Sequence, residues 1–343
     1  MTKKNIKRLA VPLLTLAFLG AVAATMICYS FNSKAIEREI NIKITSTTTY
    51  DDVVGAIKPS LRLGLHRLAF NFYAERLDLK RRYRTGNYTF GEDEDVIRIV
   101  RKLVLGEQTP VNIVVGEART LPQLAGKLAS QIEADSVEIL STMRNEQIRK
   151  ELGFVKDSTI AMFIPNTYEV YWNISPEKLL HRINREYRSF WNEERTTKLK
   201  RCGLSKYEAI TLASIIYEET KVASEMATIA GVYINRLRQG IPLGADPTVK
   251  YAIGDFGLKR VLHKHLKYRS PFNTYIKKGL PPAPICIPSV EAIEAVLEYE
   301  EHNYIYFCAR PELDGRHNFA RTLKEHNANA RKYTEALNKL KIK

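Results

Sequence analysis

The sequence predicts an α+β protein with a single N-terminal transmembrane helix, a module of small strand–helix units, and a second domain of mixed α/β structure. Three observations lead to this fold class. An uncharged stretch, residues 9–33, follows a short basic tail. Residues 41 to about 135 alternate between short β-type and helical patterns, and residues from about 161 onward carry longer helical patterns separated by loops rich in Pro and Gly. A chain of 343 residues is long enough for two domains.

Residues 9–30 are predicted to form a membrane anchor. The uncharged core from Leu9 to Tyr29 is long enough to cross a bilayer of about 30 Å at about 1.5 Å per residue. Four basic residues precede it, so the positive-inside rule leaves residues 1–8 in the cytoplasm and everything after about residue 34 outside. A cleaved signal peptide is the competing interpretation, but the run is long for one and no A-x-A site follows. We expect a single-pass protein of the inner (plasma) membrane with periplasmic domains.

Charge and cysteine content narrow the class of partner. The formal net charge is +15, and without the four cations of the tail the exported part carries about +11. Such a surface suits anionic lipid or a carboxylate-bearing polymer, whereas nucleic acid is disfavoured by the compartment and by the lack of a recognition motif. Cys28, Cys202, Cys286 and Cys308 match no zinc or redox spacing. The sequence leaves open whether Cys202 and Cys286, or Cys286 and Cys308, form a disulfide bond.

Residues 38–135 are predicted to form a repeat-like N-terminal module. Each of three segments reads as a short strand, a polar turn and a helix, and a further helical segment covers residues 62–79. The expected strands and helices are the INIKIT strand (residues 40–45) with 51–57, 87–90 with 96–105, and 111–115 with 121–128.

Residues 136–160 are predicted to be a helical connector, and residues 161–340 the second domain. That domain should contain several helices, one strand and a basic helical tail. The expected helices are 176–199, 205–222, 224–239, 289–301 and the tail from about 322, the strand is 304–309, and the loops are 241–248 and 270–290.

The helix expected from residue 205 carries the most informative pair of residues. Ser205 and Glu208 have the spacing of a capping box. At about 100° per residue, this helix has an apolar face that includes Leu212 and Ile216. Glu218 lies nearly opposite that face, and Glu219 lies on its flank. A half-buried carboxyl has a raised pKa and can serve as a general acid, so Glu219 is a candidate catalytic residue. The alternative is a rim glutamate bonded to a neighbouring loop.

Four further polar–aromatic clusters occur in the second domain. They combine aromatic rings with Asn, Asp and Thr, which suits sugars, although each one alone is also typical of turns. The clusters are 165–168, 245–251, 270–275 with 279–282, and 304–307 with 315–319. Asp246 could supply the second carboxylate of an ordinary glycosidase. His263 and His265 lie in a basic stretch without nearby acidic or Cys ligands, so we expect no metal site. The sequence also lacks P-loop, G-x-G-x-x-G and G-x-S-x-G motifs, and we expect no cofactor.

The ordered segments ASIIYEET, ADPTVKY, SPFNTY, GLPPAPI and YIYF…GRHNF…EHN resemble the MltG/YceG-like family, the membrane-anchored endolytic murein lytic transglycosylases. The resemblance covers nearly the whole chain and implies a LysM-like region within residues 38–135 and a catalytic domain over residues 161–340. It implies cleavage of the MurNAc–GlcNAc β-1,4 bond of peptidoglycan, with one glutamate acting first as acid and then as base to give a 1,6-anhydro end.

The resemblance also implies site residues and partners. Glu219 is the expected acid/base, and the expected substrate-binding or positioning residues are Asp246, Thr248, Asn273, Tyr275 and Tyr168. The expected partners are peptidoglycan glycan strands, the inner membrane and, by family analogy, peptidoglycan synthases. A hydrolase using Glu219 and Asp246, or a non-catalytic cell-wall-binding scaffold, are the alternatives.

Two departures from the family pattern stand out. Tyr217 takes the first position of a Glu-x-Glu motif, which leaves Glu219 as the retained glutamate. Gly244 stands where the family commonly has Gln, so any contact made by that side chain must be missing or supplied by another residue.

Overall fold

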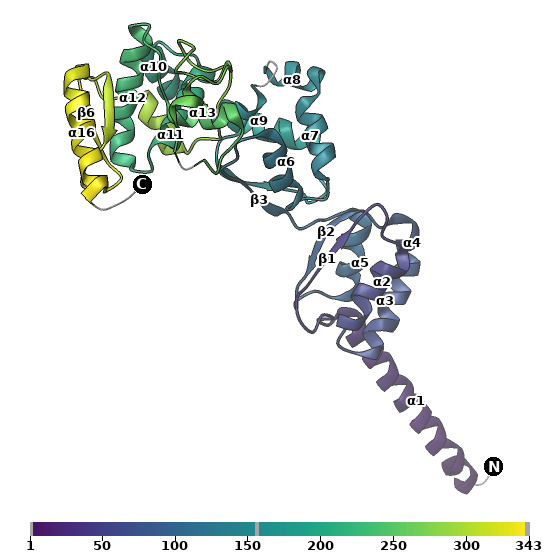
Figure 1. The fold of residues 1–343 in the computed structure, drawn as a ribbon. Coiled ribbons are helices and arrows are strands. Elements are labelled where there is room, and N and C mark those ends of the chain that lie inside the picture. The colour runs from purple at the N-terminus through teal and green to yellow at the C-terminus, as the bar shows by residue number, and fades with distance from the viewer. Residues whose placement is uncertain (1–2, 155–157, 259, 340–343) are drawn as a thin grey trace. The chain divides into compact units, whose positions relative to one another are not determined.

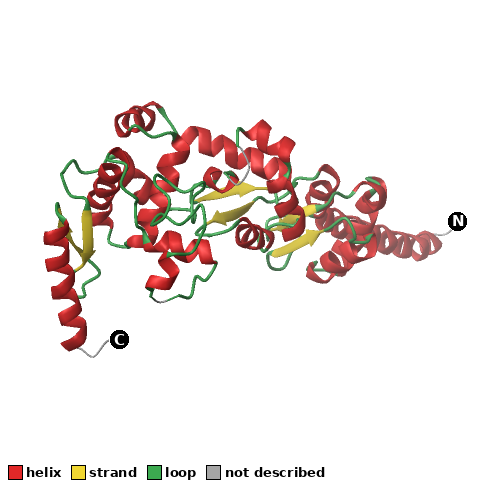
Figure 2. Cartoon of the chain, turned by 45° about the horizontal axis from the view of Figure 1, so that its top comes forward, coloured by secondary structure: helices red, strands yellow, loops and turns green. Residues whose placement is uncertain are grey.

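The computed structural model describes residues 3–154, 158–258 and 260–339, and the chain divides into two compact units (Figure 1). The first unit comprises residues 1–112 and 169–174, and the second comprises residues 113–168 and 175–343. Both units mix helices with short two-stranded sheets (Figure 2), in agreement with the predicted α+β class. The division passes through strands β3 (Val111–Val115) and β4 (Asn166–Val170), which pair with each other.

The first unit begins with the long helix α1, Lys3–Asn32. Within it, Leu14–Asn32 is long and apolar enough to cross a membrane, and its side chains are mostly exposed. Apolar side chains on all sides of a helix are typical of a segment surrounded by lipid. The prediction of one N-terminal apolar helix is confirmed.

The rest of the first unit is a small sheet covered by helices. Strands β1 and β2 pair antiparallel, with Ile40 opposite Phe90 and Ile44 opposite Gly86. The elements are β1 (Ile40–Ile44), α2 (Tyr50–Ile57), the 3₁₀ turn η1 (Lys58–Ser60), α3 (Gly64–Arg76), α4 (Leu79–Arg82), β2 (Gly86–Phe90) and α5 (Val96–Leu105). The predicted strand and helix positions are confirmed, but the strands pair with one another rather than forming separate units.

Helix α5 shows how the sequence fixes an element. The Asp95 side chain caps its N-terminus by accepting from the backbone N–H of Arg98 at 2.8 Å, and Gly106 ends it in the left-handed region at φ 72°. Its buried residues recur at the helical period, which anchors it in the core. They are Val96, Ile99, Val100, Leu103 and Val104.

The second unit holds most of the helices. Its elements after β3 are α6 (Leu121–Ala129), α7 (Ser136–Arg144), α8 (Glu146–Leu152), η2 (Thr159–Met162), β4, α9 (Pro176–Phe190), α10 (Glu193–Cys202), α11 (Lys206–Glu219), α12 (Ala223–Arg238), α13 (Asp246–Ile253), α14 (His263–Leu266), α15 (Val290–Leu297), β5 (Tyr306–Ala309), β6 (His317–Ala320) and α16 (Leu323–Lys339). Helix α11 lies in the middle and packs against α12, α13 and α15, while α16 packs on the β5–β6 hairpin.

Several expected boundaries were wrong. The helix expected over 176–199 is two helices, because Asn192 caps a new one by accepting from the N–H of Arg195 at 2.9 Å. The helix expected over 289–301 ends at Leu297, where the chain turns and the N–H of Glu300 bonds to the carbonyl of Ala227 in α12. The expected loop 241–248 runs into helix α13 at Asp246, since Pro at the first helical turn is tolerated.

Two strands were not predicted. Residues 165–168, which the sequence suggests as turn-forming, lead into β4, and β6 occupies residues 317–320. Both are segments of four or five residues, too short to carry a strong strand signal of their own.

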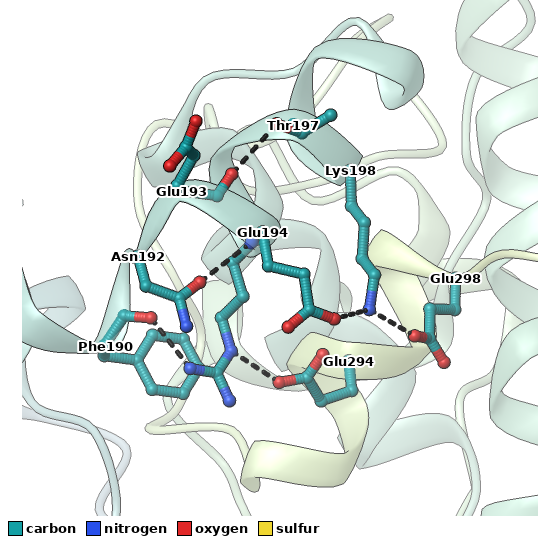
Figure 3. A network of polar contacts seen from close by, with 9 residues as sticks. Phe190, Asn192, Glu193, Glu194, Thr197, Lys198, Glu294 and Glu298 are labelled. Atoms are coloured by element: carbon teal, nitrogen blue, oxygen red, sulfur yellow. Dashed lines mark hydrogen bonds and ion pairs between the residues drawn. The ribbon is translucent and has the colours of Figure 1, made fainter.

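An ion-pair network fastens α10 to α15, which in turn packs against α11 (Figure 3). Arg195 Nε bonds to Glu294 Oε1 at 2.6 Å, and Lys198 Nζ bridges Glu194 and Glu298 at 2.6 Å each. The Arg195 guanidinium also stacks over the Phe190 ring at 4.1 Å. Isolated surface ion pairs contribute little to stability. A network that joins Phe190 of α9, helix α10 and helix α15 restrains the relative position of these three helices.

Candidate active site

Glu219 is the last residue of α11. The prediction of one apolar face on this helix was wrong, because every residue from Ala209 to Ile216 is buried, covered by neighbouring helices on several sides. The predicted capping box is present, with the Ser205 N–H bonded to Glu208 Oε2 at 2.8 Å. At the other end, Thr220 adopts an extended conformation and stops the helix, so the Glu219 carboxyl leaves the core beside a cavity.

Tyr233 holds the Glu219 carboxyl. It lies on α12 and is almost fully buried, with its ring edge-on to Phe307 at a centroid distance of 5.7 Å. Its hydroxyl donates to Glu219 Oε1 at 2.9 Å. A phenol bond fixes the carboxyl without supplying a full positive charge.

The electrostatic setting of Glu219 favours the protonated form. Burial of the carboxyl raises its pKa to about 7, and the nearby charge of Asp246 acts in the same direction. The Tyr233 hydrogen bond and the positive charges of Lys250 and Arg236 oppose this rise and keep the value near neutrality. A carboxyl with a pKa near the working pH can both donate and accept a proton.

Glu219 opens onto a cavity of about 560 Å³, within the size range of small-molecule sites of about 300–1,000 Å³. The wall combines aromatic rings with polar and charged groups, as sugar-binding sites do. The other lining residues are Arg236, Ile241, Pro242, Leu243, Gly244, Asp246, Tyr275, Tyr306, Phe307, Cys308, Ala309, His317, Leu323, His326 and Asn327.

Two of the predicted positioning residues line this cavity together. Asp246 is the first residue of α13, and Tyr275 follows in a distant loop. The Tyr275 hydroxyl donates to Asp246 Oδ1 at 2.6 Å, so the pair forms one polar wall next to Glu219. The negative charge of Asp246 is thereby oriented by a neutral donor.

Thr248 and Asn273 are fully buried and do not line the cavity. Thr248 Oγ1 donates to the Ala245 carbonyl at 2.6 Å and lies 2.8 Å from Thr274 Oγ1. Asn273 donates to the carbonyls of Leu266 and Tyr268, and its own carbonyl accepts from the Tyr275 N–H at 3.0 Å. These bonds hold the backbone that presents Asp246 and Tyr275.

Tyr168 lies elsewhere. It belongs to β4, is 2% exposed, and its hydroxyl donates to the Ile164 carbonyl at 2.8 Å. It is not among the cavity-lining residues, so this geometry offers no direct substrate contact for it. Of the six predicted site residues, the structure therefore brings Glu219, Asp246 and Tyr275 into one cavity.

Sequence reasoning missed the contribution of α12, whereas the β5–β6 hairpin carries part of the predicted cluster 304–307 with 315–319. Tyr233 bonds to Glu219, and one turn later Arg236 lines the cavity while bonding to the carbonyls of Ile305 and Leu243 at 2.6 Å each. A Tyr and an Arg three residues apart share a helix face, and this spacing was an available signal. His317, which belongs to the predicted cluster 315–319, lines the cavity and pairs with Glu225 Oε2 at 3.0 Å.

Gly244 is explained by its conformation. Its φ is 60°, a region that side chains rarely adopt, and a Cβ there would lie 3.2 Å from Arg236 Nη1. Since Gly244 lines the cavity, Arg236 occupies space that a longer residue at this position would need.

Glu218 has a different partner. Arg119 Nη2 contacts both of its carboxylate oxygens, at 3.1 and 2.9 Å. The Arg119 guanidinium also lies over the Phe256 ring, 5.3 Å from its centroid. A carboxylate bound to an arginine in this way is suited to holding two elements of the fold together.

The four cysteines are free, which answers the open question about disulfides for this structure. Among the described residues, no three His, Cys, Asp or Glu side chains gather as metal ligands.

Comparison with known proteins places this geometry in a family. The model of the YceG-like family matches residues 42–332, which is most of the chain. The chain belongs to the YceG-like family. All cavity-lining residues fall within the matched range.

Named relatives and a solved structure agree with this assignment. An endolytic murein transglycosylase of Bacillus subtilis is 29% identical over 315 residues, which cover 87% of this chain and 86% of that protein. An endolytic murein transglycosylase of Streptococcus pneumoniae is 26% identical, over 82% of this chain and 56% of its own length. The crystal structure of a yceG-like protein from Listeria monocytogenes superposes with a TM-score of 0.57 at 26% identity, covering 85% of this chain and 99% of that one.

Proposed function

We propose that this protein is an endolytic peptidoglycan lytic transglycosylase with Glu219 as its single acid/base. The observation that carries the proposal is the Glu219 carboxyl, whose pKa is raised to about 7 where it opens onto an aromatic and polar cavity. The names of the Bacillus and Streptococcus relatives support the same activity.

The reaction requires one carboxyl group to act twice. Protonated Glu219 donates its proton to the glycosidic oxygen between MurNAc and GlcNAc, and the bond from that oxygen to C1 of MurNAc breaks. The resulting Glu219 carboxylate then takes the proton of the MurNAc C6 hydroxyl, and O6 bonds to C1 to give the 1,6-anhydro end. No water is consumed, and Glu219 returns to its protonated state. The intramolecular nucleophile adds a large effective molarity.

The other predicted residues act on position and charge. Asp246 and Tyr275 line the cavity as a hydrogen-bonded pair, suited to contacting sugar hydroxyls. The negative charge of Asp246 also helps to keep the Glu219 pKa high. Thr248 and Asn273 hold the backbone of this pair. Tyr168 supports β4 through its bond to Ile164.

Location and partners are part of the proposal. The apolar stretch of α1 fits an inner-membrane anchor with the catalytic domain in the periplasm, acting on nascent glycan strands near peptidoglycan synthases. Residues 38–135 would act as a LysM-like glycan-binding module.

Digestion of purified peptidoglycan followed by mass spectrometry of the products tests the reaction. We expect new 1,6-anhydro-MurNAc ends within strands, and Glu219→Gln should abolish them. Because Asp246 shares the cavity, a hydrolase using both carboxylates is the second candidate. New reducing MurNAc ends would favour that hydrolase, and glycan binding without any cleavage would favour a scaffold.

A further inference from the structure

A second cavity of about 690 Å³ lies in the same structural unit as the Glu219 cavity. Its lining combines residues from the expected connector region with residues of the motifs that begin at 245, 270 and 279. Most of those motif residues have no place in the Glu219 cavity. We call it the arginine–aromatic pocket, after Arg144, Arg149, Tyr251 and Phe272.

The charge of this pocket favours an anionic ligand. Arg144 ends helix α7 and is exposed, and Arg149 lies on the next helix, α8. No Asp or Glu occurs among the lining residues that the structure describes. Two arginines without a compensating carboxylate in the wall suit a planar carboxylate, which the guanidinium fork binds with two hydrogen bonds.

Two buried polar atoms in the wall also call for a ligand. Arg149 Nε and Thr159 Oγ1 have no hydrogen-bond partner in the part of the chain that is described, and Thr159 is fully buried. Buried polar groups are almost always satisfied in folded proteins, because an unmade bond costs free energy. A ligand carrying both a carboxylate and amide groups could supply what these atoms lack.

Another part of the lining is aromatic. The Tyr251 and Phe272 rings lie 4.7 Å apart, and Phe256 extends the cluster at 6.1 Å from Tyr251. Such a wall suits small apolar groups, such as the methyl side chains of alanine residues or the face of a sugar. The pocket thus pairs an anion site with an apolar surface, as a short acidic peptide would require.

The pocket is joined to the Glu219 cavity by two shared elements. Helix α13 presents Asp246 to one cavity and Tyr251 to the other, about 7.5 Å apart along the helix axis at about 1.5 Å per residue. The loop after residue 270 likewise presents Phe272 to the pocket and Tyr275 to the cavity. The two cavities are therefore close neighbours within the second unit.

We propose that the arginine–aromatic pocket binds the carboxylate-bearing peptide stem of a glycan strand whose scissile bond lies at Glu219. The proposal rests on the proposed function, since it takes the polymer as peptidoglycan. It makes Arg144, Arg149 and the Tyr251–Phe272 pair specificity determinants for strands that carry stems.

Binding without turnover tests this assignment. In the Glu219→Gln background, isothermal titration compares two soluble glycan oligomers of equal length, one with peptide stems and one freed of stems by an amidase. We expect the stem-bearing oligomer to bind about tenfold more tightly, on the scale of one charge-assisted hydrogen bond. Arg144→Gln, which changes an exposed residue, and Phe272→Ala should each reduce this preference severalfold.

The control is Arg185→Gln, which removes the same charge from an exposed position on α9 that lines neither cavity. It should keep the full preference. Equal affinity for both oligomers in the parent protein would overturn the proposal. An equal loss for both oligomers in Arg144→Gln would assign the pocket to the sugar backbone or its lactyl carboxylate instead.

The outcome is separable from the proposed function. If wild-type digests lack anhydro ends while the stem preference and its loss in Arg144→Gln persist, the reaction is wrong and the pocket stands. If anhydro ends form but no stem preference exists, the pocket proposal fails alone.

Discussion

Glu218 and Glu219 are adjacent in the chain but lie in opposite environments. Arg119 contacts both oxygens of Glu218, whereas Glu219 accepts from the neutral phenol of Tyr233 and opens onto a cavity. One carboxylate is paired with a full positive charge, and the other has its pKa raised to about 7 by burial. The comparison teaches that the surroundings created by folding, more than the residue type, decide what role a carboxyl can take.

The comparison is most sharply tested by replacing each glutamate in turn. Glu219→Gln should lower kcat by about 10³-fold or more, because general acid–base catalysis contributes about 10²–10⁴-fold and both steps here use one group. Release of anhydro-ended fragments from purified peptidoglycan is the measurement. Activity that survives Glu219→Gln and disappears in Glu218→Gln would reverse the assignment.

The pH dependence of the free energy of unfolding gives the second test of the difference between Glu219 and Glu218. The folded-state pKa of Glu219, about 7, lies above the ordinary value of 4.5, so its contribution to stability is fully present below pH 4.5 and is lost as the pH rises through 7. Above pH 7 the loss approaches about 3 kcal/mol, the free energy of a shift of this size. Glu219→Gln should therefore become progressively more stable than the wild type between pH 4.5 and 8 in urea titrations.

If the stability difference between wild type and Glu219→Gln is constant across that pH range, the carboxyl is not held protonated. Glu218→Gln measured in parallel gives the matched comparison at the neighbouring position.

Glu218→Gln should chiefly destabilise the fold. It removes a two-point ion pair between α11 and the segment before α6, and such a partly buried pair contributes about 1–2 kcal/mol. We expect a lower urea midpoint at unchanged m-value, with kcat within about threefold of wild type. A hundredfold loss of kcat at unchanged stability would instead give Glu218 a part in the chemistry.

The smallest expected effect comes from Tyr233→Phe. Its hydrogen bond lowers the Glu219 pKa, so removing it should raise that pKa and move the alkaline limb of the kcat/KM profile to higher pH. Because the Glu219 carboxyl is then no longer held in one orientation, kcat should also fall by roughly tenfold. Tyr217→Phe removes a hydroxyl from α11, two residues before Glu219, and should leave the limb in place. A limb that does not move in Tyr233→Phe would show that another group controls it.

Much of the fold could be predicted because its signals are local. The capping box at Ser205, the cap and glycine stop of α5, and the apolar N-terminal run each depend on residues within a few positions. Errors arose where distant contacts intervene. Helix α15 ends early because Glu300 bonds to Ala227 in α12, and β4 pairs with β3, which lies far earlier in the chain.

For the candidate site, the sequence by itself selected Glu219, Asp246 and Tyr275, since their motifs carry polar and aromatic groups in a family-like order. It separated Glu219 from Glu218 through an apolar face that the fully buried helix does not have. Only the tertiary structure supplied the real distinction, Arg119 for one and Tyr233 for the other. The physical reason is that a pKa depends on burial and on charges brought close by folding, and neither quantity can be read from neighbours along the chain.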